Sequence, residues 1–480
     1  MKNRITHILK TKYIEYIILS ILILIGFAAR LYKITNPIAD WHSFRQADTA
    51  SVSRIYIVDG INLFIPKYHD ISRVQSGLFN PHGYRFVEFP IYNALHAFVA
   101  KNFTFLSFEV WGRLTSVFYT LTTSFVIFLI GRKLYGKWLG VISSACYLLL
   151  PYNIYFTRVI LPEPLAILFA VTALWFFLLY QDDQKYKYLL LSSILLSLGI
   201  LVKPYVVFFG LPLAYYFFNK YGLKRSLINK HVLISIIIVV LPFMLWRVWE
   251  QKFPEGIPFW TWTFNGDGIR FKPAFWKWIF GDRLGFLILG VWGVIPFTFG
   301  ILSLRKKDNF LISLLLGMFL YVSIIATANV RHDYYQTLLI PVVSLVLAKG
   351  LLEMWKLDYG NNIVRKLSIL FFVFLSMITS AFQIREFYKI NHPEIIEAGN
   401  AVDRLTPKDA IVIANYNGDT AFLYQTKRRG WPVVELPINE LIDEGAQYYV
   451  SVNYDEQTKK FMEQFQIVVK TDKYVILKLI

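Results

Sequence analysis

The chain has 480 residues, of which 56% are hydrophobic and only 17% are charged, and its mean hydropathy is +0.45. A soluble domain usually has about a quarter of its residues charged, so the composition indicates a membrane protein with several spans. The net charge of +18 does not call for nucleic acid as a partner, because basic residues gather in the cytoplasmic loops of membrane proteins. A single cysteine, Cys146, excludes an internal disulfide and a thiolate metal cluster.

Long apolar runs predict about eleven membrane-spanning helices. The first run is about 20 residues long and no small-residue cleavage site follows it, so we expect a retained helix rather than a signal peptide. The fifth and sixth spans form one run that breaks at Lys203-Pro204, since proline disrupts a helix. The expected spans are 13–34, 109–130, 138–157, 163–181, 187–202, 204–219, 231–250, 284–304, 309–328, 334–353 and 367–387.

Positive charge predicts how these helices are oriented. One alternating set of short segments carries nineteen Lys and Arg residues, whereas the opposite turns carry only Arg158, Lys203 and Arg331. The basic set should be cytoplasmic. It consists of Met1–Lys12, Gly131–Trp138, Gln181–Tyr188, Asn219–Lys230, Arg305–Asp308 and Trp355–Lys366. The amino terminus is then cytoplasmic and, with an odd number of spans, the carboxyl terminus is extracytoplasmic.

Two long loops fall on the outer side in this topology. The first, about 35–108, contains the apolar stretch 87–106, which has the length of a span but also five polar residues. Counting it as a span would invert every later loop against the charge rule, so we expect a helix lying in the membrane interface. The second loop, about 251–283, is rich in tryptophan, which suits the headgroup layer.

The composition changes near Glu386 to that of a soluble domain. AIVIANY and AQYYVSVNY read as strands, PEIIEAGNAVDRL and DEQTKKFMEQF as helices, and QIVVK and KYVILKLI as closing strands. We therefore expect a transmembrane domain over 1–387 and a small extracytoplasmic α/β domain over 388–480. The basic stretch TKRRGWPV could guide an anionic molecule toward the protein, but a solvated basic turn is the simpler interpretation.

Several polar residues gather at the predicted outer ends of the spans, where they are costly unless they face a polar cavity or headgroups. Asp40 follows a bend at Pro37 and no helix begins on it, so we favour a chemical role for this residue. Asp48 opens a short helical stretch that ends at Gly60, so we expect it to be an N-cap. Glu163, in a Pro-Glu-Pro turn, could equally cap the fourth span.

The other candidates are cationic or aromatic. Lys203 and Arg331 could bind an anion or extend to lipid phosphate, and His332 could be a ligand or a packed histidine. We expect Tyr334 and Tyr335 to be interfacial anchors rather than site residues. No Walker A, GxGxxG or HExxH pattern and no Cys/His cluster is present, so a nucleotide or zinc enzyme is not indicated. A carboxylate-bound divalent cation is possible, but no motif supports it.

The order of these pieces resembles the GT-C membrane glycosyltransferases, in particular the protein O-mannosyltransferase and aminoarabinose-transferase branch often grouped as glycosyltransferase family 39. The resemblance covers most of residues 1–390. It rests on DWHSFRQADTA, FPIYNAL, LPEPLA and RHDYYQ, and on a span that opens with Trp111-Gly112-Arg113-Leu114.

The resemblance implies a polyprenyl-phosphate-linked sugar as donor and an early acid of the first outer loop as general base. The mannosyltransferase branch has Asp-Glu at this point, whereas this chain has Asp40-Trp41 and Asp48-Thr49. A variant pattern, Asp-aromatic-His-x-x-Arg-Gln, is similar to residues 40–46 and, with the capping argument, favours Asp40 as the base. By position, Glu163 matches a second outer-face acid of the family.

The proposed chemistry assigns roles to the remaining candidates. The leaving lipid phosphate needs cationic or N–H partners, and these are sought among Arg45, Lys203, Arg331 and His332, with His42, Tyr334 and Tyr335 nearby. We expect a glycosyltransferase of the cell membrane, of bacterial plasma-membrane type, that acts on a lipid, glycan or protein acceptor outside the cell. A lipid-linked glycan flippase and a glycan polymerase or ligase remain the alternatives.

Overall fold

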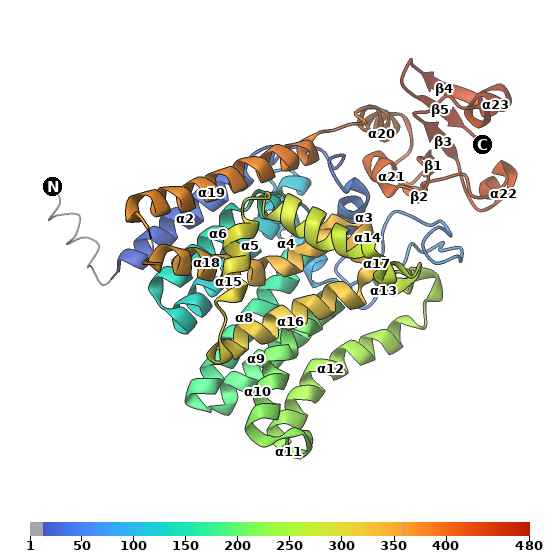
Figure 1. The fold of residues 1–480 in the computed structure, drawn as a ribbon. Helices are drawn as coiled ribbons and strands as arrows, with labels where there is room; N and C mark the ends of the chain where they lie inside the picture. Colours follow the sequence, from blue (N-terminus) through green and yellow to red (C-terminus); the bar gives the residue numbers. More distant parts are fainter. Residues whose placement is uncertain (1–12, 359) are drawn as a thin grey trace.

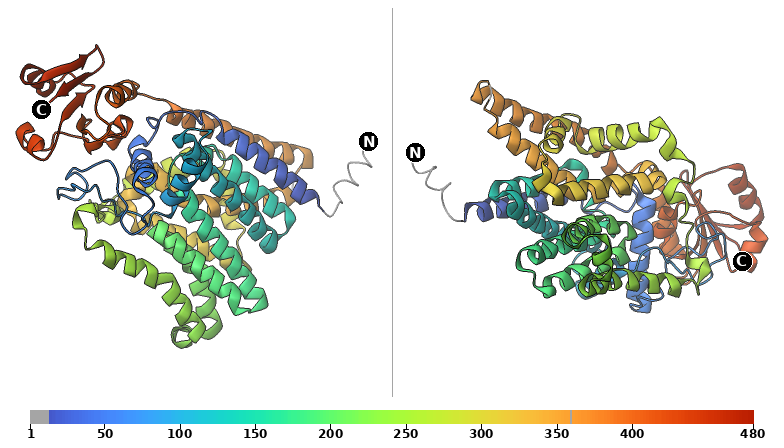
Figure 2. Two further views of the ribbon diagram at one scale, coloured as in Figure 1. Left: turned by 180° about the vertical axis from the view of Figure 1, so that it is seen from behind. Right: turned by 60° about the horizontal axis from the view of Figure 1, so that its bottom comes forward.

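The computed structural model describes residues 13–358 and 360–480, and it consists of a helical bundle with a small sheet at one end (Figure 1). The basic segment Met1–Lys12, on which part of the orientation prediction depends, lies outside the described residues. In both further views the sheet again lies at one end of the bundle, beside the long first loop (Figure 2).

The bundle is built from helices of unequal length, several of them joined end to end. In chain order they are α2 (Ile14–Arg30), α5 (Phe108–Tyr135), α6 (Lys137–Leu149), α7 (Pro151–Phe156), α8 (Glu163–Asp183), α9 (Tyr186–Val202), η1 (Pro204–Gly210), α10 (Leu211–Tyr221), α11 (Leu223–Ile228), α12 (Lys230–Glu250), the π-helix η4 (Lys277–Ile288), α15 (Val294–Leu302), η5 (Lys306–Asp308), α16 (Asn309–Ile324), α17 (Ala326–Arg331), η6 (Asp333–Leu339), α18 (Ile340–Lys356), α19 (Asn362–Ile384) and η7 (Arg385–Tyr388).

Six of the described helical segments are long and apolar enough to cross a membrane. They are 108–135, 163–183, 230–250, 306–324, 333–356 and 362–388, and two shorter apolar helices, α6 and α9, accompany them. All eleven expected spans fall on helical structure, so the polytopic helical fold is confirmed, while the number of eleven stays a prediction.

Two of the expected spans show where backbone breaks occur. The break at Lys203 is confirmed, because α9 ends at Val202 and η1 begins at Pro204, with Lys203 extended between them (φ −148°, ψ 106°). The span expected over 284–304 is not one continuous helix: η4 ends at Ile288 and α15 begins at Val294. A break in a helix leaves backbone polar groups without their partners in the helix. In membrane proteins such groups are tolerated where they are buried in protein or line a polar cavity.

The first long loop contains two helices, α3 (Ser43–Asp59) and α4 (Ile91–Asn102). α4 confirms the helix expected within 87–106. The second long loop contains only short helical turns: η2 (Pro254–Gly256), α13 (Trp262–Asn265), η3 (Ile269–Phe271) and α14 (Pro273–Trp276). Both loops lie at the end of the bundle that carries the sheet (Figure 1).

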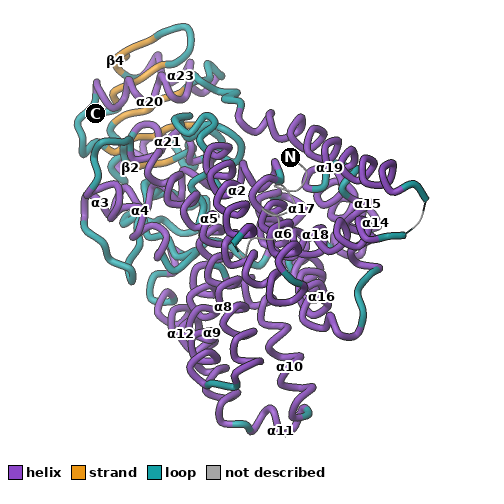
Figure 3. Tube along the Cα trace, turned by 90° about the vertical axis from the view of Figure 1, so that its left-hand side faces the viewer, coloured by secondary structure: helices purple, strands orange, loops and turns teal. Residues whose placement is uncertain are grey.

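The C-terminal part contains a five-stranded mixed sheet, in which the strands are confined to one corner of the molecule (Figure 3). Its order is β2 (Arg429–Trp431), β1 (Ile411–Asn415), β3 (Tyr448–Ser451), β5 (Val475–Lys478) and β4 (Gln466–Lys470). β1 is parallel to both β2 and β3, and the other pairs are antiparallel. The expected helices are α20 (Glu394–Leu405) and α23 (Glu456–Gln464).

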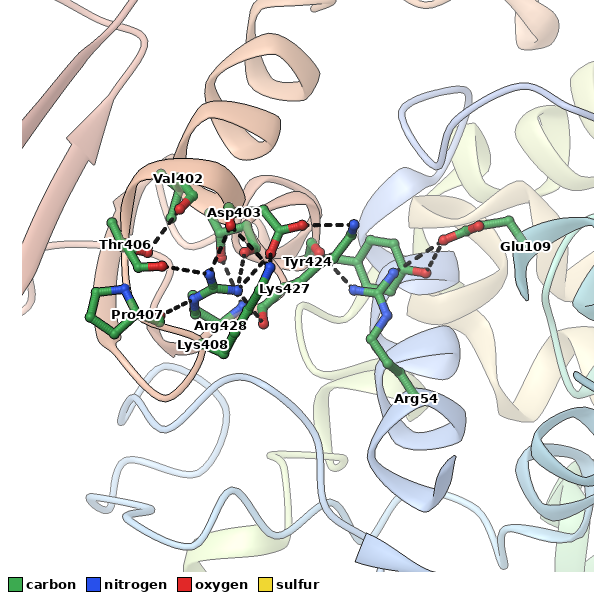
Figure 4. A network of polar contacts seen from close by, with 11 residues as sticks. Arg54, Glu109, Val402, Asp403, Thr406, Pro407, Lys408, Tyr424, Lys427 and Arg428 are labelled. Atoms are coloured by element: carbon green, nitrogen blue, oxygen red, sulfur yellow. Dashed lines mark hydrogen bonds and ion pairs between the residues drawn. The ribbon is translucent and has the colours of Figure 1, made fainter. Parts of the chain in front are cut away.

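Three elements of this part were not expected from the sequence, namely β2, α21 (Thr420–Thr426) and α22 (Ile438–Asp443). The interpretation of TKRRGWPV as a solvated basic turn is wrong, because the stretch ends α21 and forms β2. Arg428 is buried, and it donates to Pro407 O at 2.7 Å and to Asp403 Oδ1 at 2.9 Å (Figure 4). The charge of this arginine therefore stabilises the domain rather than facing solvent.

Candidate functional site

A cavity of about 570 Å³ lies where α9 breaks, between α3, η1, α12 and the two long loops. One end is polar and is formed by charged side chains from α3, the first loop and the α9 break. The remaining walls are largely apolar and come from η1, α12 and the second loop. Val207 of η1 and Val240 of α12 line the cavity and are also 49% and 43% exposed, so the apolar walls continue onto the surface of the bundle that would face lipid.

Helix α3 carries two charged residues into the polar end. The helix begins at Ser43, after His42 in a left-handed conformation (φ 54°, ψ 38°). Arg45 and Asp48 are three residues apart, so they share one face of the helix, and both line the cavity. The expected N-cap role of Asp48 is wrong, because Asp48 lies in the second turn of a helix that starts earlier.

Asp48 is buried and both of its carboxylate oxygens have a partner. Arg85 Nη2 lies 2.6 Å from Oδ2, and Thr420 Oγ1 donates to Oδ1 at 2.7 Å. Burial works against the charge of Arg85, but Asp48 outweighs it and raises the pKa of this arginine above its usual value. A carboxylate offers about four lone-pair positions, so Asp48 keeps acceptor capacity toward the cavity.

A chain of alternating charges crosses the polar end. Arg45 is ion-paired with Glu88, and Lys203 Nζ lies 3.6 Å from Glu88 Oε1 and 2.6 Å from Glu163 Oε1. Burial again opposes the charge of Arg45, while Glu88 raises the pKa of Arg45 above its usual value. Two cations from different elements therefore meet at one wall of the cavity.

The neighbouring wall is formed by His332, Tyr334 and Tyr335. Tyr334 and Tyr335 are buried and line the cavity, and Lys203 Nζ lies 5.9 and 5.1 Å from their ring centroids. Interfacial anchoring, the role expected for these tyrosines, is therefore wrong. Burial lowers the pKa of His332, also in this wall, to about 4, so His332 can offer an N–H to an anion but no charge at neutral pH.

Asp40 and Glu163 lie behind the cavity wall. The Asp40 side chain is fully buried, 3.1 Å from Arg158 Nη2, and accepts from Gln46 Nε2 at 2.7 Å. Glu163 is the first residue of α8 and is also fully buried, against Lys203. Neither side chain is among those that line the cavity. Both acids hold cations in place at the junction of the first loop and the bundle.

Two further candidates lie away from the polar end. Arg331 is 58% exposed and lies 3.7 Å from Asp267, outside the cavity lining. His42 Nε2 is hydrogen-bonded to Asp333, which also accepts from Trp41 Nε1 at 3.1 Å. The His42 ring stands edge-on to Tyr334 at 5.1 Å, so it supports the wall from behind.

Sequence reasoning missed three residues of the site: Arg85, Glu88 and Thr420. Glu88 had a detectable signal, since it is a carboxylate inside an otherwise apolar stretch. Arg85 and Thr420 had none, because each reaches Asp48 from a segment distant in the sequence.

Within residues 13–358 and 360–480, no three His, Cys, Asp or Glu side chains are grouped so that they could hold a metal ion.

Residues 90–249 match the family model described as dolichyl-phosphate-mannose-protein mannosyltransferase. No match was found among curated protein sequences.

Solved structures give a match over almost the whole chain. ArnT from Cupriavidus metallidurans bound to undecaprenyl phosphate superposes with a TM-score of 0.62 at 13% identity, covering 98% of this chain and 99% of that one. This is the GT-C fold. The apo state of the same ArnT gives a TM-score of 0.63 at 14% identity, with 97% of both chains covered.

An archaeal enzyme with the same fold also matches. The oligosaccharyltransferase AglB from Archaeoglobus fulgidus, in complex with an inhibitory peptide and a dolichol-phosphate, gives a TM-score of 0.62 at 11% identity. The match covers 92% of this chain and 69% of that one. The fold expected from the sequence, that of the GT-C membrane glycosyltransferases, is thereby confirmed.

Proposed function

We propose that this protein is a membrane glycosyltransferase that moves a sugar from a polyprenyl-phosphate donor to an acceptor hydroxyl or amine. The observation that carries the proposal is the cavity itself. Three cations (Arg45, Arg85 and Lys203) and two carboxylates (Asp48 and Glu88) meet at one end, and the apolar walls run from there to the lipid-facing surface. A ligand with a charged head and a long isoprenoid tail matches both ends at once, whereas a soluble nucleotide sugar would leave the apolar walls uncovered.

The donor phosphate is assigned to Arg45 and Lys203. Both line the cavity, and the Arg45 guanidinium offers a planar fork that suits phosphate oxygens. His332 and the Tyr334 hydroxyl add neutral hydrogen-bond donors on the neighbouring wall. As the bond between anomeric carbon and phosphate oxygen breaks, the released phosphate gains negative charge, and these groups stabilise it.

The general base is assigned to Asp48. Its carboxylate lines the cavity on the same helical face as Arg45, so an acceptor bound between them would present its proton to Asp48 while the sugar is held by its phosphate. The acceptor oxygen or nitrogen bonds to the anomeric carbon, its proton passes to Asp48, and polyprenyl phosphate leaves. Asp40 is assigned a scaffolding role instead, because it is sealed against Arg158.

The isoprenoid tail is placed along α12 and η1. Val207, Val239 and Phe243 line the cavity there, and the outward face of α12 carries exposed apolar residues such as Leu241 and Leu245. In Figure 1 α12 lies at the side of the bundle, joined to it through α11. A tail in this position stays in contact with lipid throughout the reaction.

Transfer and donor binding test the proposal together. The purified chain in lipid vesicles is supplied with polyprenyl-phosphate sugars carrying a labelled sugar, and with lipid, glycan and peptide acceptors. We expect label on one acceptor class and release of polyprenyl phosphate, and loss of donor binding in the variant Arg45→Gln/Lys203→Met. Donor binding that is unchanged in this variant would contradict the assigned phosphate site.

A flippase for a lipid-linked glycan is the main alternative. A flippase needs a polar path that opens to both sides of the membrane, whereas the charged groups of this cavity gather at the end that carries the sheet. Movement of labelled lipid across the vesicle bilayer without sugar transfer would favour the flippase.

The side of the membrane and the acceptor complete the proposal. We assign the cavity and the C-terminal domain to the extracytoplasmic side of a bacterial plasma membrane, with the amino terminus on the cytoplasmic side. The excess of Lys and Arg in the opposite set of loops supports this orientation. A polymerase or ligase would share this geometry and would differ only in taking a glycan as acceptor. The panel of acceptors separates these activities.

A further inference from the structure

The C-terminal domain reaches the cavity carboxylate through Thr420, the first residue of α21. Thr420 Oγ1 donates to Asp48 Oδ1 at 2.7 Å, and both residues are buried. The same hydroxyl lies 3.3 Å from Phe44 O, but it has one proton, and the nearer, carboxylate acceptor is the stronger partner. Because Arg85 of the first loop holds Oδ2, Asp48 is fixed from two sides by two separate parts of the chain.

Helix α21 is itself attached firmly to α3 and α5. Arg54, six residues after Asp48 on α3, donates to Tyr424 O at 2.9 Å, and its guanidinium lies 3.8 Å from the Tyr424 ring centroid. Glu109 of α5 accepts from Tyr424 Oη at 2.8 Å and from Arg54 Nη2 at 3.1 Å (Figure 4). These contacts set the distance between α21 and α3, and hence between Thr420 and Asp48.

The sheet provides a second attachment. Gly430 of β2 donates to His69 O at 3.0 Å, and Ile71 N donates to Gly430 O at 2.9 Å, so residues 69–71 of the first loop extend the sheet by a short parallel bridge. A Cβ at position 430 would lie 1.7 Å from Val412 O, so only glycine fits there. The sheet edge and the first loop are thereby held in one register.

The start of α21 fixes the position of Thr420 locally. Asp419 caps the helix, with its Oδ1 accepting from Ala421 N at 2.7 Å. Thr420 therefore has a defined backbone position, and its β-branched side chain has few rotamers. These features suit a residue that must aim one hydroxyl at one acceptor.

We propose that Thr420 is a positioning residue for Asp48, so that the C-terminal domain completes the active site of the bundle. The inference rests on the proposed function, in which Asp48 is the base. The hydroxyl holds the carboxylate in one rotamer, with its free lone pairs toward the acceptor, while donor binding depends on Arg45 and Lys203. Loss of the hydroxyl should therefore lower kcat and leave the KM for the donor almost unchanged.

The test compares three variants of the full-length protein in vesicles with the transfer assay. Thr420→Val removes the hydroxyl and keeps the shape, and Thr420→Ser keeps the hydroxyl. Thr426→Val is the matched control for loss of a buried hydroxyl in the same helix: Thr426, at the other end of α21, donates to Leu423 O at 2.6 Å and accepts from Arg428 N at 3.2 Å. We expect kcat to fall about tenfold in Thr420→Val alone, with KM for the donor changed less than about twofold. In an Asp48→Asn background, Thr420→Val should cause no further loss.

Two results would overturn the positioning role. One is wild-type kcat in Thr420→Val, and the other is an equal loss of kcat in Thr420→Val and Thr426→Val, which would show a purely structural effect. The proposed function fails in a different way, since the wild-type protein would then transfer no sugar from any donor. An active wild-type protein with an unaffected Thr420→Val variant therefore rejects only the inference about Thr420.

Discussion

Lys203 Nζ lies 2.6 Å from Glu163 Oε1, at a point where α9 has just ended and α8 is beginning. Glu163 is fully buried, and the lysine that neutralises it also forms part of the cavity wall. One ion pair thus joins the packing of the bundle to the proposed phosphate site, so a change at Lys203 should affect stability as well as binding.

Lys203→Met should destabilise the protein by about 3–5 kcal/mol, because it removes the ion-pair partner of a buried carboxylate. Adding Glu163→Gln should restore most of the loss, since the uncompensated charge is then gone. Thermal unfolding in detergent measures both variants. Donor binding should stay weak in the double variant, and a single Lys203→Met variant as stable as wild type would contradict the role assigned to the pair.

Substitutions of Asp48 and Asp40 should have opposite effects on transfer and on stability. Asp48→Asn should lower transfer by about 10²–10⁴ while donor binding is kept, as expected for the loss of a general base. Asp40→Asn should lower the unfolding temperature, because Arg158 loses a charged partner inside the protein, and the folded fraction should retain most of its kcat. Rates normalised to folded protein distinguish the two. Full transfer by Asp48→Asn would return Asp40 to consideration as the base.

The apolar walls of the cavity should make the affinity for the donor depend on the length of its isoprenoid tail. Val239→Trp adds a large ring to the wall between α12 and η1, so we expect affinity for a long polyprenyl phosphate to fall at least about tenfold. Affinity for a short-chain analogue should change less. Val248→Trp is the control, since Val248 is on the same helix but 66% exposed and outside the cavity lining. Equal effects of both variants would place the tail elsewhere.

The stability of the folded protein should depend on pH through Asp419, which caps α21 in the C-terminal domain. Burial, with a further contribution from Asp48, raises the pKa of Asp419 from 3.8 to about 6. The folded state therefore binds this proton more tightly than the unfolded state. The proton on Asp419 therefore stabilises the folded state. This contribution is complete below about pH 4 and is lost as the pH rises through about 6.

Asp419→Asn tests this dependence, because asparagine also caps a helix and carries no charge at any pH. At pH 7.5 the variant should be more stable than wild type by roughly 1–3 kcal/mol, and the difference should shrink as the pH approaches 4. Unfolding midpoints measured from pH 4 to 8 give the comparison. A constant difference across this range would show that Asp419 does not titrate as described.

How much could be read from the sequence depends on whether an interaction is local. The periodicity of residues 394–405 predicted α20, and the short apolar run at 411–415 predicted β1, because each element carries its own pattern. β2 has only three residues and completes its pairing with the first loop, so no local pattern marks it. The polar residues beside apolar runs were found for a similar reason: a charge at the end of a span is costly and therefore conspicuous.

The choice between the two aspartates shows where such reasoning fails. The helical pattern that follows Asp48 predicts a cap at this residue, but α3 starts five residues earlier, after a left-handed His42 that no propensity rule favours as a cap. The partners that distinguish Asp40 from Asp48 are Arg158 on one side and Arg85 with Thr420 on the other. These contacts exist only in the folded chain.

The apolar walls that include Val207 and Val240 continue onto the surface that would face lipid. A donor using this cavity would arrive by lateral diffusion and would never dissolve in water. The quantity that sets the reaction rate is then the mole fraction of donor among the bilayer lipids. Diluting the vesicles in buffer should leave turnover per protein unchanged, whereas adding inert phospholipid at constant donor should slow it.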